Sequence, residues 1–409
     1  MLRWGRGVVV RVAIVGGKLQ GVEAAFLARE AGWEVLLVDR KPGLPASGLC
    51  HSFYQCDVVK DAPALCQLVE KEMVDLIVPA LEGTVALRAL EKCAGAVGIP
   101  LAYDAVAYSV TNSKKRSNHL FEKLGIPLPR SWPQCGLPLM IKPSVSSGSQ
   151  GVTRIDNEKE LSDFVGRVGS GLEDWVLQEY LEGPSYSVEV LGLAGHYTVL
   201  QVTELEMDAR YDCKRVLAPA RVSVLLERQI KDIALTIARG LHLKGIMDVE
   251  FVLDRGVLKV FEIDARLPSQ TPTAVYMSTG INMLKLLGDI FVKDTLPPVP
   301  EVKVARGVVY EHVKISGTSL EILGEHIMTE AGPLEMTTRF FGADVGLSNF
   351  NQEQLPLVAT LVTSGESLEQ AWLGHKRVIE NIRDYLEEDG CLEDGSGGVG
   401  LAAAPLSRG

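Results

Sequence analysis

Residues 245–274 read GIMDVEFVLDRGVLKVFEIDARLPSQTPTA and contain two strand-like runs on either side of Asp254-Arg255-Gly256. Both runs are rich in β-branched and aromatic residues, which favour strands. A three-residue loop with glycine in the left-handed position would join the runs and pair Leu253 with Val257. We therefore predict an antiparallel hairpin in the middle of the chain.

The predicted hairpin has one acidic face and one apolar face, because side chains alternate along a strand. The acidic face carries Asp248, Glu250, Glu262 and Asp264. The apolar face carries Met247, Val249, Phe251, Phe261 and Ile263. We expect the apolar face to pack in a core.

The acidic face has two interpretations, and the commoner one for an acidic strand is a solvated outer surface. Here, however, carboxylates on neighbouring strands repel, and at about 4 Å with an effective dielectric constant of about 20 each unscreened pair costs ~4 kcal/mol. A bound cation would relieve this repulsion. Oxygen ligands without a nearby His or Cys favour Mg²⁺, which shares its remaining positions with phosphate oxygens and water. Arg266 projects from the same side and could meet a phosphate.

Lysines and a serine-rich loop upstream supply positive charge and hydrogen-bond donors. Lys114 and Lys115 begin a helical segment, and Lys142 ends the strand LMIK directly before the loop PSVSSGSQG. The loop has four serines and two glycines in residues 144–151, which suits a flap that wraps a triphosphate. It is not a Walker P-loop, and an ordinary flexible surface loop is the alternative interpretation.

The run LQEYLEG at 177–183 resembles a strand that passes into a linker. Glu179 could accept a hydrogen bond from the exocyclic amine of an adenine, and the backbone of Tyr180 and Leu181 could hydrogen-bond to the ring. An exposed glutamate in a linker explains the same residues equally well.

The N-terminal turn Gly16-Gly17-Lys18-Leu19-Gln20-Gly21, with Asp39 at the end of the next strand, is similar to a dinucleotide fingerprint. The spacing differs from G-x-G-x-x-G, and the bulk of Lys18 and Gln20 disfavours close approach of a pyrophosphate. A nicotinamide-dependent oxidoreductase is therefore the remote alternative. A turn before a helix N-terminus can equally receive a substrate carboxylate.

Composition and charge narrow the class of protein. The 409 residues carry 41 Lys and Arg against 52 Asp and Glu, a formal net charge of −11 that disfavours broad binding to nucleic acid or membrane. No stretch approaches the ~18 apolar residues of a membrane span. Seven scattered cysteines without a C-x-x-C pair suggest neither a disulfide framework nor a zinc site. We expect a cytoplasmic protein with reduced thiols.

Changes in pattern along the chain predict four segments. Strands alternating with helices favour an α/β unit over residues 1–112, and mixed strands and helices favour an α+β unit over 113–297. The PPVP cluster marks the next boundary, followed by a smaller α+β unit over 298–388. Residues 389–409 are rich in Gly, Ala and Ser and are predicted to form a flexible tail.

Lysines, a Ser/Gly flap, a Glu-containing linker and E-x-D on a hairpin, in this order behind an α/β unit, resemble the ATP-grasp superfamily of carboxylate–amine ligases. The resemblance covers nearly all of residues 11–300, including the Gly-Ile-Pro-x-Pro turn after the lysine-rich helix. It implies an N-terminal Rossmann-like (pre-ATP-grasp) domain, a central ATP-grasp domain and a small C-terminal α+β domain. Another ATP-grasp ligase with different amino acids or a small carboxylate is the alternative at this level.

Longer strings narrow the resemblance. VGGKLQGVEAA, YDCK, GIMDVE and EIDARLPSQTPTAVYMSTGIN are similar to the pyrrolysine-biosynthesis ligases that join (3R)-3-methyl-D-ornithine to L-lysine. The match is looser in the C-terminal unit, where it includes YEH at 310–312. The resemblance implies phosphorylation of the methylornithine carboxylate by ATP and attack of the lysine ε-amine, giving 3-methyl-D-ornithyl-N6-lysine, ADP and phosphate. It also suggests a homodimer, and no nucleic-acid or membrane partner.

The resemblance implies a role for each matching position. Lys142 and Arg266 would be catalytic. ATP would be bound by Lys114, Lys115, Lys142, Ser146, Ser147, Glu179, Tyr180, Leu181, Asp212 and Lys214. The amino-acid substrates would contact Lys18, Leu19, Gln20, Glu82, Ser187, Glu189, Asp264, Arg266, Ser269 and Thr273. Two Mg²⁺ ions would be held by Glu250, Glu262 and Asp264.

Overall fold

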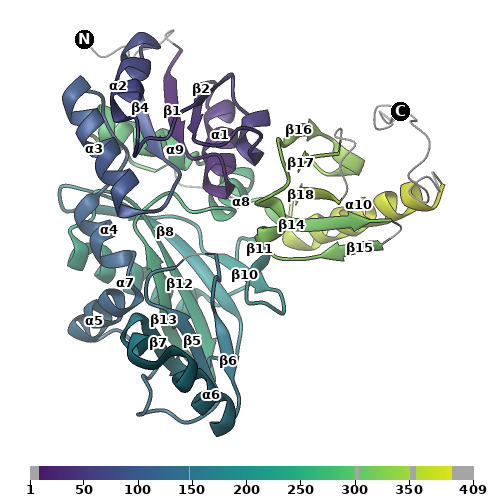
Figure 1. The fold of residues 1–409 in the computed structure, drawn as a ribbon. Coiled ribbons are helices and arrows are strands. Elements are labelled where there is room, and N and C mark those ends of the chain that lie inside the picture. Colours follow the sequence, from purple (N-terminus) through teal and green to yellow (C-terminus); the bar gives the residue numbers. More distant parts are fainter. Residues whose placement is uncertain (1–8, 147, 300–303, 318, 351–355, 389–409) are drawn as a thin grey trace.

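The computed structural model describes residues 9–146, 148–299, 304–317, 319–350 and 356–388 (Figure 1). These residues form three β-sheets with helices packed around them. The predicted tail at 389–409 and the predicted flap residue Ser147 lie outside the described residues. Within those residues, no helix has the length and apolar character needed to cross a membrane.

The N-terminal part, in purple and blue at the top of Figure 1, is a four-stranded parallel sheet in the order β3-β2-β1-β4. Its strands are β1 (Arg11–Val15), β2 (Glu34–Asp39), β3 (Ser52–Gln55) and β4 (Leu76–Pro79). Its helices are α1 (Leu19–Glu30), α2 (Ala62–Lys71) and α3 (Thr84–Val97). Continuous Val, Ile and Leu runs suit a parallel sheet covered on both faces. The predicted strand, turn, helix and strand at the start of the chain are confirmed.

Close packing explains the glycines of the turn after β1. A Cβ atom on Gly16 would lie 2.1 Å from the carbonyl oxygen of Ala80, and one on Gly21 would lie 2.2 Å from the carbonyl oxygen of Gly16. The carboxylate of Asp39 accepts a hydrogen bond from the Gly17 N–H at 2.9 Å. Asp39 therefore holds the turn, and the dinucleotide-like pattern has a structural cause.

A small antiparallel sheet in the order β6-β5-β7 follows in the chain. Two helices lead into it, α4 (Ala105–Thr111) and α5 (Lys114–Leu124). Its elements are β5 (Leu139–Pro143), β6 (Thr153–Ile155), α6 (Glu158–Val168) and β7 (Trp175–Glu179). Leu161 and Phe164 of α6 pack against Leu139, Ile141 and Leu177 of the sheet. The predicted strands around Lys142 and Glu179 are confirmed.

The third sheet has eleven strands, nine of them in the order β13-β12-β8-β10-β11-β14-β18-β17-β16. Strands β8 (Ser185–Leu193), β9 (His196–Val199), β10 (Thr203–Met207), β11 (Cys213–Ala218), β12 (Gly245–Asp254) and β13 (Val257–Asp264) come from the middle of the chain. Strands β14 (Gly307–Ser316), β15 (Ser319–Ile322), β16 (Glu335–Thr338), β17 (Val345–Ser348) and β18 (Leu357–Gly365) come from its C-terminal part. Because β11 pairs with β14, the sheet continues across the predicted boundary at 297–298. The division into domains stays a prediction.

Helices cover this large sheet. They are α7 (Val224–Leu241), α8 (Thr271–Thr279), α9 (Met283–Val292) and α10 (Leu368–Glu388). Figure 1 shows α10 lying along β14 and β18 in the arm at the right of the view. The predicted C-terminal helix is confirmed.

The hairpin β12–β13 forms with a register that differs from the prediction. Asp254, not Leu253, pairs with Val257, so the loop is the two-residue Arg255-Gly256, and both loop residues have positive φ. This is the geometry of a two-residue hairpin turn, whose twist matches that of the strands.

A bulge in β13 then restores the expected acidic face. Glu250 pairs with Glu262 and Phe251 pairs with Val260, so Phe261 is the extra residue. Val260 takes the core position, and Phe261 lies against the Lys142 side chain instead of in the core. The prediction of Phe261 in the core was wrong because a two-residue period cannot anticipate a bulge.

Buried charges join the middle of the sheet to α10. Arg215 of β11 forms ion pairs with Glu206 and with Glu311 of β14, which has no exposed surface. The second oxygen of Glu311 lies 2.5 Å from Nε2 of His375 on α10. Burial alone would raise the pKa of Glu311, but the hydrogen bond and charge of His375 and the charge of Arg215 lower it.

We expect Glu311→Gln to lower the free energy of unfolding by about 3 kcal/mol or more at pH 7, because it leaves buried cationic partners uncompensated. The pKa of Glu311 lies below its unfolded value of about 4.3. Its contribution is therefore present above about pH 4.3 and lost as the pH falls below that value. Urea unfolding followed at several pH values measures both effects.

The matched control is Asp232→Asn, which breaks a pair with Arg228 in which both side chains are exposed. It should change the free energy of unfolding by at most about 0.5 kcal/mol. Equal effects of the two substitutions would contradict a structural role for the Glu311 network.

Candidate active site

The acidic face of the hairpin is partly buried, with Asp248 buried and Glu250, Glu262 and Asp264 half-buried. Asp248 pairs across the strands with Asp264, and Glu250 pairs with Glu262. Burial, followed by the charge of Glu189, raises the pKa of Asp248 well above its usual range. Burial and the charges of Asp248 and Glu262 do the same for Glu250. These carboxylates crowd one another, which is the arrangement that a cation would relieve.

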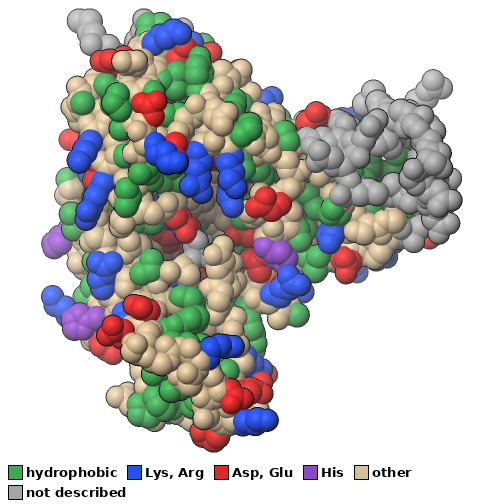
Figure 2. Space-filling view, viewed as in Figure 1, with side chains coloured by type: hydrophobic (Ala, Val, Ile, Leu, Met, Phe, Trp, Pro, Cys, Tyr) green, Lys and Arg blue, Asp and Glu red, His purple; other side chains and the backbone are tan. Residues whose placement is uncertain are grey.

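Charged side chains surround a hollow on the face shown in Figure 2, with Lys and Arg gathered above it and Asp and Glu around it. Two of the predicted lysines approach the acidic face. Lys114 is 8% exposed, and its Nζ lies 3.1 Å from Oε1 of Glu262. Lys142 is also buried, and its Nζ donates to the carbonyl oxygen of Phe261 at 3.5 Å. Burial lowers the pKa of Lys142.

Lys115 does not join these two lysines. It is exposed, and its ammonium donates to the carbonyl oxygen of Glu173 at the edge of a surface hollow. On the α5 helix the neighbouring positions 114 and 115 face different ways, so only one of them can reach the hairpin.

The Ser/Gly loop lies beside the lysines. The carbonyl oxygen of Ser146 accepts a hydrogen bond from Nζ of Lys114 at 2.7 Å. The Ser149 hydroxyl donates to the carbonyl oxygen of Tyr211, in the turn between β10 and β11, at 2.7 Å. The described part of the loop therefore contacts both the lysine group and a distant turn.

Glu179 is already engaged. Its Oε1 lies 2.5 Å from Nζ of Lys259, and its Oε2 accepts from Nε of Arg130 at 2.9 Å. Burial alone would raise the pKa of Glu179, but these hydrogen bonds lower it. An adenine amine would have to share this carboxylate. The Tyr180 ring lies under the Arg154 guanidinium at 4.3 Å, and Leu181 is half-buried beside it.

Arg266 gathers several of the predicted substrate residues. Its guanidinium pairs with Asp264 at 2.6 Å and with Glu82 at 2.8 Å, and it donates to Oε1 of Gln20 at 2.8 Å. Arg266 thereby joins the hairpin to the N-terminal turn. Lys18, next to the half-buried Leu19, is exposed and lies 3.7 Å from Glu330.

Ser187 and Glu189 of β8 lie beside the acidic face, in register with Glu250 and Asp248 of β12. The Ser187 hydroxyl donates to Oδ1 of Asp248. Glu189 has no exposed surface, and neither of its carboxylate oxygens has a hydrogen-bond partner among the described residues. Burial raises its pKa to about 7.

Ser269 and Thr273 flank the start of α8. Within the described residues the buried hydroxyl of Thr273 also lacks a hydrogen-bond partner. The backbone N–H groups of Gln270 and Thr273 donate to the carboxylate of Glu23 on α1. Glu23 was missed from the sequence, although a charged residue within the buried run of α1 was the available signal.

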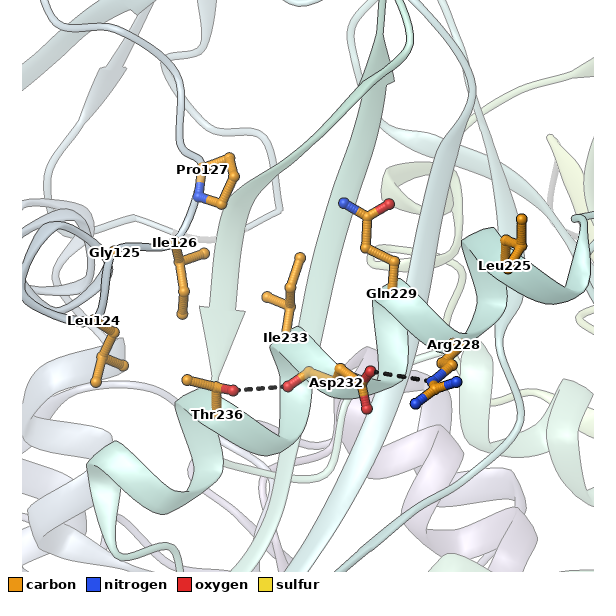
Figure 3. Close-up of a pocket in the computed structure, with 10 residues that line it drawn as sticks. All are labelled: Leu124, Gly125, Ile126, Pro127, Leu225, Arg228, Gln229, Asp232, Ile233 and Thr236. Atoms are coloured by element: carbon orange, nitrogen blue, oxygen red, sulfur yellow. Dashed lines mark hydrogen bonds and ion pairs between the residues drawn. The ribbon is translucent and has the colours of Figure 1, made fainter.

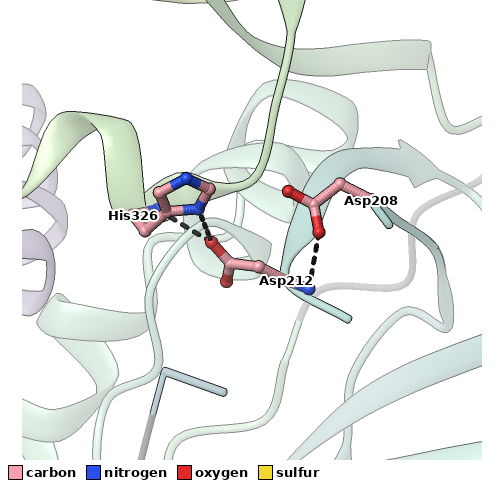
Figure 4. Close-up of side chains that lie close together, drawn as sticks. All are labelled: Asp208, Asp212 and His326. Atoms are coloured by element: carbon pink, nitrogen blue, oxygen red, sulfur yellow. Dashed lines mark hydrogen bonds and ion pairs between the residues drawn. The ribbon is translucent and has the colours of Figure 1, made fainter. Parts of the chain in front are cut away.

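Asp212 and Lys214 lie near the turn between β10 and β11. Figure 4 shows Asp212 with Asp208 and His326, whose ring Nδ1 lies 2.6 Å from Oδ2 of Asp212. The three side chains could hold a metal ion by composition, but the two carboxylates already accept hydrogen bonds from the backbone N–H groups of Asp212, Gly324 and His326. Asp212 therefore contacts the C-terminal part of the chain rather than the lysine group. Lys214 is half-buried at the start of β11.

A separate surface hollow of about 470 Å³ lies between residues 124–127 and α7 (Figure 3). It is lined by apolar side chains and by the Arg228–Asp232 pair. None of the predicted site residues lines it. The acidic face and its lysines are the better candidate for the active site.

Comparison with known proteins identifies the fold of the chain. A family model described as the ATP-grasp domain matches residues 111–270. The biotin carboxylase domain of Hydrogenobacter thermophilus 2-oxoglutarate carboxylase, in a complex with MgADP, ADP and bicarbonate, has a TM-score of 0.70 at 14% identity and covers 90% of this chain and 89% of that one. The ADP complex of an N5-carboxyaminoimidazole ribonucleotide synthetase has a TM-score of 0.67 at 16% identity, covering 93% and 99%. The ATP-grasp fold predicted from the sequence is confirmed.

A curated relative narrows the family further. The chain is 36% identical over 322 residues to the 3-methyl-D-ornithine–L-lysine ligase of Methanosarcina barkeri, an alignment that covers 78% of this chain and 84% of that protein. The chain therefore belongs to the family of 3-methyl-D-ornithine–L-lysine ligases.

Proposed function

We propose that this protein joins the carboxylate of (3R)-3-methyl-D-ornithine to the ε-amine of L-lysine with consumption of ATP. The observation that carries the proposal is Glu189, a fully buried carboxylate with two unpartnered oxygens among the described residues, in register with the acidic hairpin. A buried carboxylate needs a compensating charge. The relative's named substrates are both diamino acids, which carry ammonium groups.

The nucleotide would lie between the lysines and the linker. Lys114 and Lys142 would hold phosphates next to Glu262. Ser146, which contacts Lys114, would belong to the flap, together with Ser147 from outside the described residues. Lys115 would reach the phosphates only if it broke its hydrogen bond to the carbonyl oxygen of Glu173. Glu179, with the backbone of Tyr180 and Leu181, would contact the adenine. Asp212 and Lys214, at the turn between β10 and β11, would also contact the nucleotide.

Magnesium fits the donor set of the acidic face. Glu250, Glu262 and Asp264 offer only hard oxygen atoms, and Oδ1 of Asp264 lacks a hydrogen-bond partner among the described residues. We propose that they hold two Mg²⁺ ions. When bound, the ions would neutralise charge on the triphosphate during phosphoryl transfer.

The amino acids would lie between the hairpin and the N-terminal turn. Ser187 and Glu189 would contact an ammonium group, and Arg266, Ser269 and Thr273 would orient the reacting carboxylate. Asp264 would contact both a metal ion and the substrate. The second amino acid would approach the turn formed by Lys18, Leu19 and Gln20, together with Glu82.

The proposed chemistry needs no nucleophilic side chain. At neutral pH an amine and a carboxylate form a salt, so the carboxylate oxygen first attacks the γ-phosphorus of ATP and ADP leaves. The lysine ε-amine, after losing the proton that its pKa of about 10.4 otherwise retains, attacks the acyl carbon and phosphate leaves. Lys142 and Arg266 would stabilise charge developing on the phosphoryl and acyl oxygens.

A homodimer is also proposed, on the resemblance alone. Light scattering of the purified chain, whose mass is 44.4 kDa, would distinguish a dimer from a monomer.

Turnover with mass analysis tests the proposed reaction directly. The enzyme is incubated with ATP, Mg²⁺, L-lysine and either 3-methyl-D-ornithine or D-ornithine, and the products are recorded by mass spectrometry. We expect equal amounts of ADP and an amide-linked ornithyl-lysine product, because each acyl phosphate yields one amide.

Reactions that omit one amino acid at a time are the controls. A product formed from other acids or amines, with none from ornithine and lysine, would favour the alternative of a different ATP-grasp ligase. Nicotinamide binding without ATP binding would favour the oxidoreductase.

The metal assignment predicts that Glu262→Gln lowers the rate of ADP formation by about 10²-fold or more, because it removes a group that holds transition-state counter-charge. The fold should survive, since the substitution relieves repulsion with Glu250. The matched control is Glu321→Gln at an exposed position of β15, which should keep the rate. A Glu262→Gln variant with normal melting behaviour and most of its activity would contradict the assignment.

A further inference from the structure

Unpartnered buried polar atoms gather around the start of α8. Within the described residues they include Oε1 of Gln270, the hydroxyls of Thr271 and Thr273, both oxygens of Glu189, and Oε2 of Glu325. Gln270, Thr271, Thr273 and Glu189 are all at least nine-tenths buried. Buried polar atoms are rarely left without partners, so this cluster indicates a polar ligand.

Glu325 is the member that no sequence pattern indicated. It lies in the short 3-10 turn η3 (Glu325–Met328), between β15 and β16, far along the chain from the hairpin. Burial, followed by the charge of Asp212, raises its pKa to about 7, and hydrogen bonds from Gln270 and Ser269 oppose that rise. Its charge in turn raises the pKa of Glu23 on α1, which accepts hydrogen bonds from the start of α8. Glu325 therefore faces the same group of residues as Glu189 and Glu23.

The residues on either side of Glu325 are firmly held. The Gly324 N–H donates to Oδ2 of Asp208 at 3.0 Å, and the His326 N–H donates to Oδ2 of Asp212 at 2.9 Å. A Cβ atom on Gly324 would lie 2.3 Å from Oδ2 of Asp212, so only glycine permits this approach. Figure 4 shows the His326 ring turned toward Asp212 from the neighbouring segment. The turn between β10 and β11 thus holds the backbone on either side of Glu325.

Glu23, Glu189 and Glu325 differ in how many hydrogen bonds their carboxylates accept. Glu23 accepts two backbone N–H groups at the start of α8. Among the described residues Glu189 accepts no hydrogen bond of normal geometry, although the Thr271 side chain beside it lowers its pKa, and one oxygen of Glu325 accepts none. A ligand that satisfies both must bring two cationic donors. An ammonium group supplies three N–H donors and a positive charge, which matches each of these carboxylates.

We propose that Glu325 binds the second ammonium group of the diamino acid that supplies the carboxylate, while Glu189 binds the first. The assignment rests on the proposed function and deepens it, because it names the residue that makes the pocket select a diamino acid. Glu325 is half-buried, but its Oε2 atom is shielded from solvent. Leaving this oxygen without its ammonium partner is costly, so an analogue that lacks the second amine is rejected.

Calorimetric binding in the presence of ADP and Mg²⁺ tests this assignment. The probes are D-ornithine and D-norvaline, which share the carbon chain and α-amine but differ in the side-chain amine. The wild-type protein should prefer D-ornithine strongly. Glu325→Gln should weaken D-ornithine binding by about 30-fold or more, as expected for loss of one partner of a buried charge pair, and change D-norvaline binding by less than about threefold.

Two further variants keep the test decisive. Glu325→Asp retains the charge and should keep most of the preference for D-ornithine, whether or not Glu325→Gln folds well. Glu321→Gln, exposed four residues earlier, should leave both affinities unchanged. An unchanged ratio of affinities in Glu325→Gln, a loss of preference in Glu325→Asp equal to that in Glu325→Gln, or no preference in the wild type would overturn the assignment.

Failure of the proposed reaction is distinguishable from failure of this assignment. A wild-type protein that prefers D-ornithine through Glu325 but makes no amide product would retain the binding role and lose the reaction. A protein that makes the product while Glu325→Gln keeps the wild-type preference would retain the reaction and lose the role of Glu325.

Discussion

Mutual repulsion among buried and half-buried carboxylates is the constraint on which this structure depends. Asp248, Glu250, Glu262 and Asp264 face one another across β12 and β13, and Glu189 stands on the next strand. The pKa values of Asp248 and Glu250 are raised because burial and neighbouring charges both disfavour ionisation. An arrangement this costly persists in a stable protein when cations complete it.

The surrounding fold supplies some of these cations itself. Lys114 reaches Glu262 from the start of α5, Lys142 lies over Phe261, and Arg266 pairs with Asp264. The three come from different parts of the chain, and so does Glu23 beneath α8. Arg266 also contacts Gln20 and Glu82 of the N-terminal part. The site is therefore formed by residues that lie far apart in the sequence. Its remaining negative charge can be compensated by metal ions and ammonium groups.

The sequence predicted those features of the fold and of the candidate site that depend on a local pattern of residues. Alternation along 245–264 predicted which carboxylates share a face, and the glycines after β1 predicted a tight turn. The loop length and the bulge at Phe261 escaped prediction, because both depend on the twist of the strands rather than on alternation.

Long-range contacts were harder to predict. The sequence could not show that Lys115 turns toward Glu173, or that Lys259 and Arg130 occupy the Glu179 carboxylate. Glu325 was hidden for the same reason, because only the turn at Asp208 and Asp212 brings it to the pocket.

The most direct test of the central claim is the number of protons exchanged when a diamino acid binds, measured by calorimetry at pH 7 in buffers of different ionisation enthalpy. Burial raises the pKa values of Glu189 and Glu325 to about 7, so protonated carboxyl groups are present in the free protein near neutral pH. An ammonium group beside a carboxylate lowers its pKa, so binding should release protons. Binding of D-ornithine with no proton release, or with proton uptake, would contradict the claim that these carboxylates bind cationic ligands.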